Sequence, residues 1–220
     1  MKNINIITLY PEIFPASLGV SVINRGLTSN LWKYNLYNPR DYTEDKHRTV
    51  DDTPYSGGAG MLMRADILGR TIDNIPEVDR GRMIFVSPRG RTFNQAMAEE
   101  WSREDNFTFL CGRFEGVDQR VIDYYNFEEV SLGNFVLAGG EVAVLAMVES
   151  TIRLQEGILG NKLSLEEESF SKDKLLEHDQ YTTPAEWRGH KVPPILLSGN
   201  HSKIKEWKKD QSLKITQNKL

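Results

Sequence analysis

The chain has 220 residues, of which 39% are apolar and 26% charged, with a formal net charge of −4 and a single cysteine. One cysteine excludes an intrachain disulfide and a cysteine-rich zinc site, and there is neither a signal-peptide pattern nor an apolar run of ~18 residues, so we expect a cytoplasmic protein without membrane spans. The negative charge argues weakly against a nucleic-acid partner, because phosphate binding depends on Lys and Arg.

Short β-rich segments alternate with helical patterns along roughly the first 150 residues. This alternation predicts an α/β fold with a mostly parallel sheet covered by helices. The expected strands span residues 3–9, 31–37, 82–87, 106–111 and 127–131, and the expected helices span residues 64–74, 94–102, 118–125 and 140–155. Residues 40–63 form a polar segment too long for an ordinary connection, which favours a functional loop.

The composition changes after residue 155. Residues 156–181 are polar and acidic with little apolar periodicity, which is typical of a linker between domains. Residues 182–220 contain three prolines and then a short basic helical pattern at 201–215. We therefore expect a large N-terminal domain and a small C-terminal one.

Glycine-bearing loops follow the expected strands at 82–87, 106–111 and 127–131. Ligands of open parallel sheets bind beyond the carboxyl ends of the strands, so these loops are the first candidates for a site. The loops are SPRGRTFNQ (87–95), CGRFEGVDQR (111–120) and SLGNFVLAGGE (131–141). The first is equally well explained as an ordinary connection. The second is the stronger candidate, because a turn does not need Arg113, Phe114 and Glu115 crowded between two glycines.

The glycine patterns exclude two classes of nucleotide site. The sequence has no GxxxxGK[ST] motif, and SGGAGML (56–62) fails the GxGxxG pattern because Met63 stands at the last glycine position. Glycines beside Leu132, Val136 and Leu137 instead favour a nucleoside-like ligand, such as adenosine, held by main-chain hydrogen bonds. Cys111 ends an apolar segment and is expected to be a packing residue, and the four histidines lack zinc-binding spacing.

Several strings together resemble one family, the bacterial tRNA (guanine-N1-)-methyltransferases of the TrmD type, which belong to the SPOUT superfamily. The strings occur in the family's order from about residue 4 to residue 213, so the resemblance covers nearly the whole chain. They are LYPEIF, NPRDYTEDKHRTVDDTPYSGGAGMLM, SPRGRTFNQ, CGRFEGVDQRV, SLGNFVLAGGEVAVLAMVES, GILGN, ESF, YTTPAEWRGHKVPPILLSGNH and IKEWKKDQSL.

The resemblance implies an S-adenosyl-L-methionine (AdoMet) pocket inside a trefoil knot of a SPOUT-type parallel sheet, and a homodimer with active sites at the interface. It implies a catalytic domain at residues 1–158, an interdomain linker at 159–180 and a shortened, helical, tRNA-binding C-terminal domain at 181–220. The residues expected to bind AdoMet are Ser87, Pro88, Gly90, Gly112, Arg113, Glu115, Gly116, Ser131, Leu132, Gly133, Asn134, Phe135, Val136, Leu137, Gly139 and Gly140. Glu115 is also the candidate for helping to hold the Mg²⁺ that the family is said to use.

The family methylates nitrogen 1 of the guanosine just 3′ of the anticodon. That nitrogen carries a proton at neutral pH, so a base must remove the proton, and an arginine suits the charge that then develops on the neighbouring carbonyl oxygen. The resemblance assigns the arginine to Arg153 and the base to Glu168, where the family has Asp. Phe114 likewise replaces a Tyr of the family. The longer Glu168 side chain shifts the carboxylate by roughly 1 Å, which a linker that orders on tRNA binding would absorb.

Local basic patches must provide contact with tRNA, since the total charge is negative. The two candidate patches are the four arginines of residues 80–91 and the six lysines of residues 201–220, and either could equally be a solvated face. The 40–63 loop is expected to help recognise the anticodon branch. Two alternatives stay open: another SPOUT RNA methyltransferase, and a catalytically silent RNA- or nucleotide-binding homologue.

Overall fold

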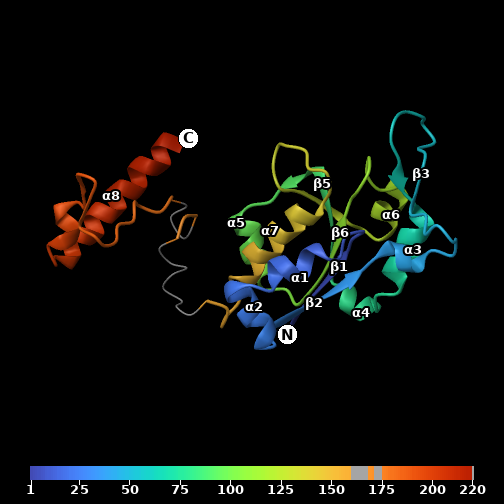
Figure 1. Cartoon of the computed structure of the whole chain (residues 1–220), viewed down its shortest axis with the longest axis horizontal. Coiled ribbons are helices and arrows are strands. Elements are labelled where there is room, and N and C mark those ends of the chain that lie inside the picture. Colours follow the sequence, from blue (N-terminus) through green and yellow to red (C-terminus); the bar gives the residue numbers. More distant parts are fainter. Residues whose placement is uncertain (160–167, 171–174, 220) are drawn as a thin grey trace. The chain divides into compact units, whose positions relative to one another are not determined.

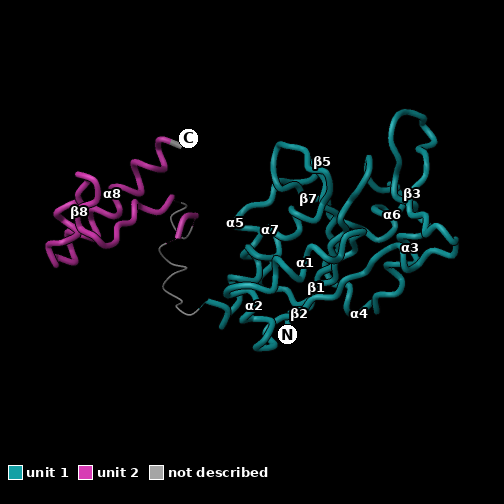
Figure 2. The backbone as a smooth tube through the Cα atoms, viewed as in Figure 1, with its two compact units in different colours: residues 1–160 teal, residues 161–220 magenta. Residues whose placement is uncertain are grey.

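The computed structural model describes residues 1–159, 168–170 and 175–219. The chain divides into two compact units, Met1–Gly160 and Asn161–Leu220 (Figure 2). The first unit holds a five-stranded sheet in the order β2-β1-β6-β5-β7, and every neighbouring pair of strands is parallel (Figure 1). The prediction of an α/β fold with a mostly parallel sheet is confirmed.

The strands of this sheet are β1 (Lys2–Ile7), β2 (Trp32–Tyr37), β5 (Arg82–Thr92), β6 (Asn106–Cys111) and β7 (Glu128–Ser131). The helices of the first unit are α1 (Ile13–Leu18), α2 (Ser21–Thr28), the 3-10 turn η1 (Pro39–Tyr42), α3 (Ala65–Asp73), α4 (Glu77–Arg80), α5 (Gln95–Trp101), α6 (Gln119–Tyr124) and α7 (Glu141–Ile152). The helices expected from the sequence are α3, α5, α6 and α7. The sequence pattern misses α1, α2 and α4, which are short and contain or follow a proline or glycine.

Helices cover both faces of the sheet (Figure 1). One apolar cluster joins the sheet to α1, α2, α5 and α7 and includes Phe14, Trp101 and Met147. The cluster on the other face joins the sheet to α3 and α6 and includes Ile72 and Val121. Strands β1 and β6 are buried along almost their whole length, and because successive side chains of a strand point to opposite faces, their apolar residues supply both clusters.

Strand β5 is longer than the expected 82–87. Its first part pairs with β7 from Ile84 to Val86, and after a shift in register Arg91 and Thr92 pair with β7 again. Pro88 and Gly90 mark the end of a strand by ordinary sequence rules, but here they lie in the irregular stretch between the two paired parts. The chain therefore stays beside β7 through the first glycine-bearing loop.

The segment 40–63 also contains structure that the sequence does not predict. Strands β3 (Asp51–Asp52) and β4 (Leu62–Met63) form a two-stranded antiparallel sheet, and the loop between them extends away from the main sheet (Figure 1). Residues 40–63 are therefore not wholly irregular. Two-residue strands leave too little periodicity to detect.

The second unit contains the hairpin β8 (Glu186–Trp187) and β9 (His190–Lys191), the 3-10 turn η3 (Pro194–Leu197) and the helix α8 (His201–Lys219). The helical pattern expected at 201–215 corresponds to α8. Trp207 of α8 lies against the rings of His178 and Tyr181, with ring centroids 6.2 and 6.3 Å away. Within the described ranges, no helix combines the length and the apolar character needed to cross a membrane.

Candidate active site

A cavity of about 530 Å³ lies at the carboxyl ends of β5, β6 and β7. Its walls come from the three glycine-bearing loops identified in the sequence, together with the start of α7 and one residue of β4. Most of the expected AdoMet-binding residues line it: Ser87, Pro88, Gly112, Arg113, Glu115, Gly116, Ser131, Leu132, Gly133, Phe135, Val136, Leu137, Gly139 and Gly140. The cavity thus lies where ligands bind in open parallel sheets.

Two of the expected residues, Gly90 and Asn134, do not line the cavity. Gly90 lies where β5 passes β7, and a Cβ atom there would stand 2.3 Å from the backbone carbon of Glu129 and the nitrogen of Val130. The absence of a side chain at Gly90 therefore lets two backbones approach closely. Its role in the structure is to bring the first loop against β7.

We expect Gly90→Ala to lower the free energy of unfolding by more than ~1 kcal/mol, because the backbone of β7 must move to admit the methyl group. Gly69→Ala is the matched control. Gly69 lies in α3, where the nearest atom to an added Cβ is 3.6 Å away, so alanine should stabilise the helix by about 0.5–1 kcal/mol. Denaturant titration measures both changes, and equal effects of the two variants would contradict this assignment for Gly90.

The long loop contributes a cavity residue, Leu62, that the sequence gives no reason to select. Backbone hydrogen bonds connect this loop to the second glycine-bearing loop: the nitrogen of Glu115 donates to the oxygen of Met61 at 2.9 Å, and the nitrogen of Met63 donates to the oxygen of Gly116 at 2.9 Å. The β3–β4 hairpin is therefore fixed to the rim of the cavity. Other lining residues absent from the expected set are Phe85, Val86, Arg89, Phe114, Val117, Gln119, Ala138 and Ala143.

A buried carboxylate, Glu141, joins three of the strand-end segments. Its side chain is 1% exposed, and both its oxygens face the Arg113 guanidinium, with Nε 3.1 Å from Oε1 and Nη2 2.8 Å from Oε2. The Thr8 hydroxyl, which follows β1, donates to Oε1 at 2.8 Å. Arg113 also donates to the oxygen of Ala138 and lies over the Tyr10 ring, 4.3 Å from its centroid. Glu141 therefore fixes the position of Arg113, and Arg113 in turn bonds to the third loop at Ala138.

Cys111 is the last residue of β6, next to the cavity residue Gly112, and is fully buried. Burial raises the pKa of the Cys111 thiol well above its usual value, and the nearby Glu141 carboxylate raises it further. A thiol that stays protonated is a poor nucleophile. Its burial and raised pKa agree with the expectation that Cys111 is a packing residue.

Glu115 and Phe114 lie at the rim of the cavity. Phe114 has a positive φ of 59° and is about half exposed, and the Glu115 side chain lies against Gly60 of the long loop. No three Asp, Glu, His or Cys side chains in the part of the chain that the structure describes are close enough together to bind a metal ion. Glu115 alone does not make an Mg²⁺ site, since the ion usually takes further carboxylate or phosphate oxygens.

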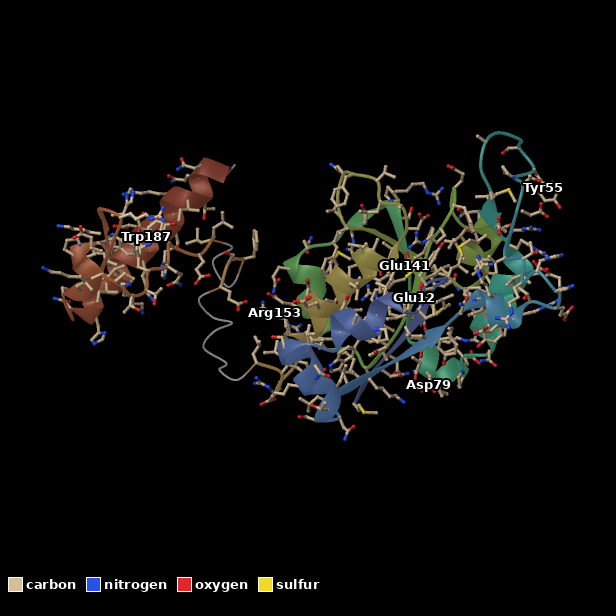
Figure 3. The ribbon with its side chains drawn as sticks, in the orientation of Figure 1. Glu12, Tyr55, Asp79, Glu141, Arg153 and Trp187 are labelled. Carbon is tan, nitrogen blue, oxygen red and sulfur yellow. The ribbon has the colours of Figure 1, made fainter. Side chains whose placement is uncertain are left out.

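Arg153, one of the two expected catalytic residues, does not line the cavity. Arg153 caps the C-terminus of α7, and Glu141 is the first residue of that helix, so the two are about 18 Å apart along its axis (Figure 3). Glu168 belongs to the second unit and is half-buried. Next to it, the nitrogen of Phe170 donates to the oxygen of Leu175 at 2.8 Å.

The arginines of residues 80–91 are paired with carboxylates, which neutralises this expected basic patch. Each makes at least one ion pair: Arg80 with Asp73, Arg82 with Glu100, Glu104 and Glu128, Arg89 with Glu129, and Arg91 with Glu128. The structure thus favours the reading of these arginines as an ordinary charged face. The hypothesis of an RNA-binding surface there loses its electrostatic basis.

Comparison with known proteins adds independent findings. The model of the family described as "tRNA (Guanine-1)-methyltransferase TrmD" matches residues 1–220. A protein named tRNA (guanine-N(1)-)-methyltransferase from Lactobacillus delbrueckii subsp. bulgaricus is 52% identical over 214 residues, which cover 97% of this chain and 85% of the relative. A protein of the same name from Ruegeria sp. (strain TM1040) is 50% identical, over 96% of this chain and 87% of the relative. Another, from Ehrlichia ruminantium (strain Gardel), is 47% identical, over 97% of this chain and 92% of the relative. A family match over the whole chain, together with relatives of this identity, shows that the chain belongs to the TrmD family.

Proposed function

We propose that this protein transfers a methyl group from AdoMet to nitrogen 1 of the guanosine immediately 3′ of the anticodon in tRNA. The observation that carries the proposal is the cavity at the ends of β5, β6 and β7, built from three glycine-bearing loops in a chain of the TrmD family. The shared name of the relatives supports the reaction.

The cavity suits AdoMet in size and lining. Its volume of about 530 Å³ lies within the usual range for small-molecule sites, roughly 300–1,000 Å³. Leu132, Val136 and Leu137 offer apolar surface for a purine ring, and the glycine-bearing loops expose main-chain groups that can hydrogen-bond its edge. AdoMet, when bound, supplies the electrophilic methyl group.

In the proposed reaction, the carboxylate of Glu168 accepts the proton from nitrogen 1 of guanine. The negative charge that remains spreads to the neighbouring carbonyl oxygen, where the guanidinium of Arg153 stabilises it. Holding the guanine in line with the methyl group provides much of the remaining rate enhancement. The hydrogen bond between Phe170 and Leu175 supports an ordered backbone next to Glu168.

The cavity loops are proposed to form a SPOUT trefoil knot. Two close approaches support it: Gly90 lies against the backbone of β7, and the nitrogen of Gly140 donates to the oxygen of Gly112 at 3.0 Å. A Cβ atom at Gly140 would stand 2.9 Å from the Cα atom of Cys111. Threaded chain segments require such contacts between backbones.

A second copy of the chain is proposed to complete each active site. Within one chain Arg153 lies about 18 Å along α7 from the end that borders the cavity, so a residue that acts on bound substrate must be brought there by another subunit. Apolar surface also lies open beside the cavity, where Val136 is 85% and Val142 58% exposed. Helix α7 is apolar on most of its faces, which is typical of a helix that is buried on both sides.

The C-terminal residues, 181–220, are proposed to bind tRNA. Residues 175–219 contain eight Lys and Arg against five Asp and Glu, in contrast to the negative charge of the whole chain. Positive charge provides most of the non-specific affinity for nucleic acid. A tRNA substrate and a single buried thiol fit a protein that works in the cytoplasm.

The test uses methyl-labelled AdoMet and tRNA transcripts that differ only in the base 3′ of the anticodon. We expect label in the guanosine transcript and background counts with adenosine, cytidine or uridine. Equal labelling of all four would contradict the proposal and favour another SPOUT RNA methyltransferase. Tight AdoMet binding without transfer to any transcript would also contradict it and indicate a silent binding protein.

A further inference from the structure

The hairpin β8–β9 of the second unit presents a tryptophan to solvent. Trp187 is 59% exposed, whereas Trp32 and Trp101 are buried in the first unit. Trp207, on α8 of the same unit, lies against other rings. An indole is costly to leave in water, and exposed aromatic side chains of this size are enriched at binding surfaces.

A cation lies over the indole. The guanidinium of Arg188 is 4.8 Å from the ring centroid of Trp187, within the usual ~6 Å limit of a cation–π contact. Arg188 and Gly189 form the two-residue turn of the hairpin, with φ of 53° and 83°. Such turns favour Asn, Asp or Gly at the first position, so an arginine there strains the backbone. The strained turn places a positive charge beside the exposed ring.

The rest of the hairpin adds to this surface. His190 is exposed and pairs across the strands with Trp187. Lys191 is also exposed and lies 3.5 Å from Glu186, its cross-strand partner. Each strand has only two residues, and a short isolated hairpin contributes little stability by itself. Aromatic and basic side chains therefore gather on an element that does not build the core.

We propose that the Trp187 hairpin, residues 186–191, binds tRNA, with the indole stacked on a base and Arg188 beside the backbone phosphates. Aromatic rings next to cations are the surface that unpaired bases of RNA prefer. The charge of the unit is complementary to RNA, whereas the arginines of residues 80–91 are neutralised by carboxylates. The inference rests on the proposed function, and it names a contact for the tRNA substrate.

The experiment measures tRNA affinity and methyl transfer for the full chain and three variants. We expect Trp187→Ala to raise the dissociation constant and the KM for a tRNA transcript about tenfold, because one stacking contact is lost. The kcat at saturating tRNA and the affinity for AdoMet should not change. Trp187→Phe should retain most of the affinity, since it keeps a flat ring. Val78→Ala is the control, because Val78 is an exposed apolar residue of α4 in the first unit, outside the residues proposed to bind tRNA, and it should bind tRNA like the parent chain.

Wild-type tRNA affinity in Trp187→Ala would overturn the proposal, as would a change in sedimentation that shows the indole holding two chains together. Two further results separate this inference from the function itself. If the parent chain binds tRNA through Trp187 but never methylates it, only the proposed function fails. If it methylates tRNA and Trp187→Ala leaves the KM unchanged, only the hairpin proposal fails.

Discussion

Glu168→Gln is expected to lower the rate of single-turnover methyl transfer to tRNA about 10²- to 10⁴-fold, the usual contribution of a general base. Glutamine keeps the size of the side chain and its hydrogen-bonding capacity but cannot take the proton from nitrogen 1. The dissociation constants of AdoMet and tRNA should change little, because the base acts on the chemical step. Rapid-quench measurements with labelled AdoMet give the rate.

Glu168→Asp is the matched control, because it keeps the carboxylate and restores the residue that the resemblance implies for the family. It should retain a rate far above that of Glu168→Gln. A Glu168→Gln protein that reacts at nearly the parent rate would contradict the assignment. The base would then be sought at Glu166 or Glu167, which lie outside the described residues.

Glu141→Ala is expected to lower the free energy of unfolding by about 3–5 kcal/mol, because it leaves the Arg113 guanidinium without its buried partner. AdoMet binding should weaken with it, since Arg113, which donates to the oxygen of Ala138 beside the cavity, loses the carboxylate that holds it. Denaturant titration and calorimetry measure the two effects.

Glu44→Ala is the control for Glu141→Ala. Glu44 pairs with Arg70 at 2.9 Å, but both side chains are largely exposed, so the loss should stay within about 0.5 kcal/mol. A Glu141→Ala protein as stable as Glu44→Ala would show that the buried pair contributes no stability.

The sheet and the cavity loops could be predicted because their signals are local. Apolar β-rich runs and glycines at the strand ends lie within a few residues of one another, and the parallel arrangement then brings those ends together. The start of β5 and the segment around Cys111 follow this rule. Family resemblance added the candidate base and arginine, which no local pattern selects.

Long-range contacts could not be predicted in this way. The Thr8 hydroxyl and the Glu141 carboxylate are 133 residues apart in the sequence but form one buried hydrogen bond. An acidic residue in the first turn of a helix is ordinarily explained by the helix dipole, so Glu141 gave no sign of its contact with Arg113. Leu62 likewise reaches the cavity only because the long loop bonds to residues 115 and 116.

The net charge of −4 argued against a nucleic-acid partner because a total charge, like a local pattern, does not show which charges lie together in the structure. It averages over a first unit in which the arginines of residues 80–91 are paired with carboxylates and a C-terminal region with an excess of Lys and Arg. The electrostatic prediction improves once charges are assigned to separate units. The region proposed to bind tRNA is then the one with the excess of positive charge, and it carries Trp187.

The most direct test of the account identifies the modified nucleoside itself. The protein is incubated with AdoMet and an unmodified tRNA transcript with guanosine 3′ of the anticodon, and the RNA is digested and separated by liquid chromatography with mass spectrometry. The account predicts 1-methylguanosine, which maps to that position when the tRNA is first cut into oligonucleotides. Methylation at another nitrogen, on the ribose, or at another position of the tRNA would contradict it.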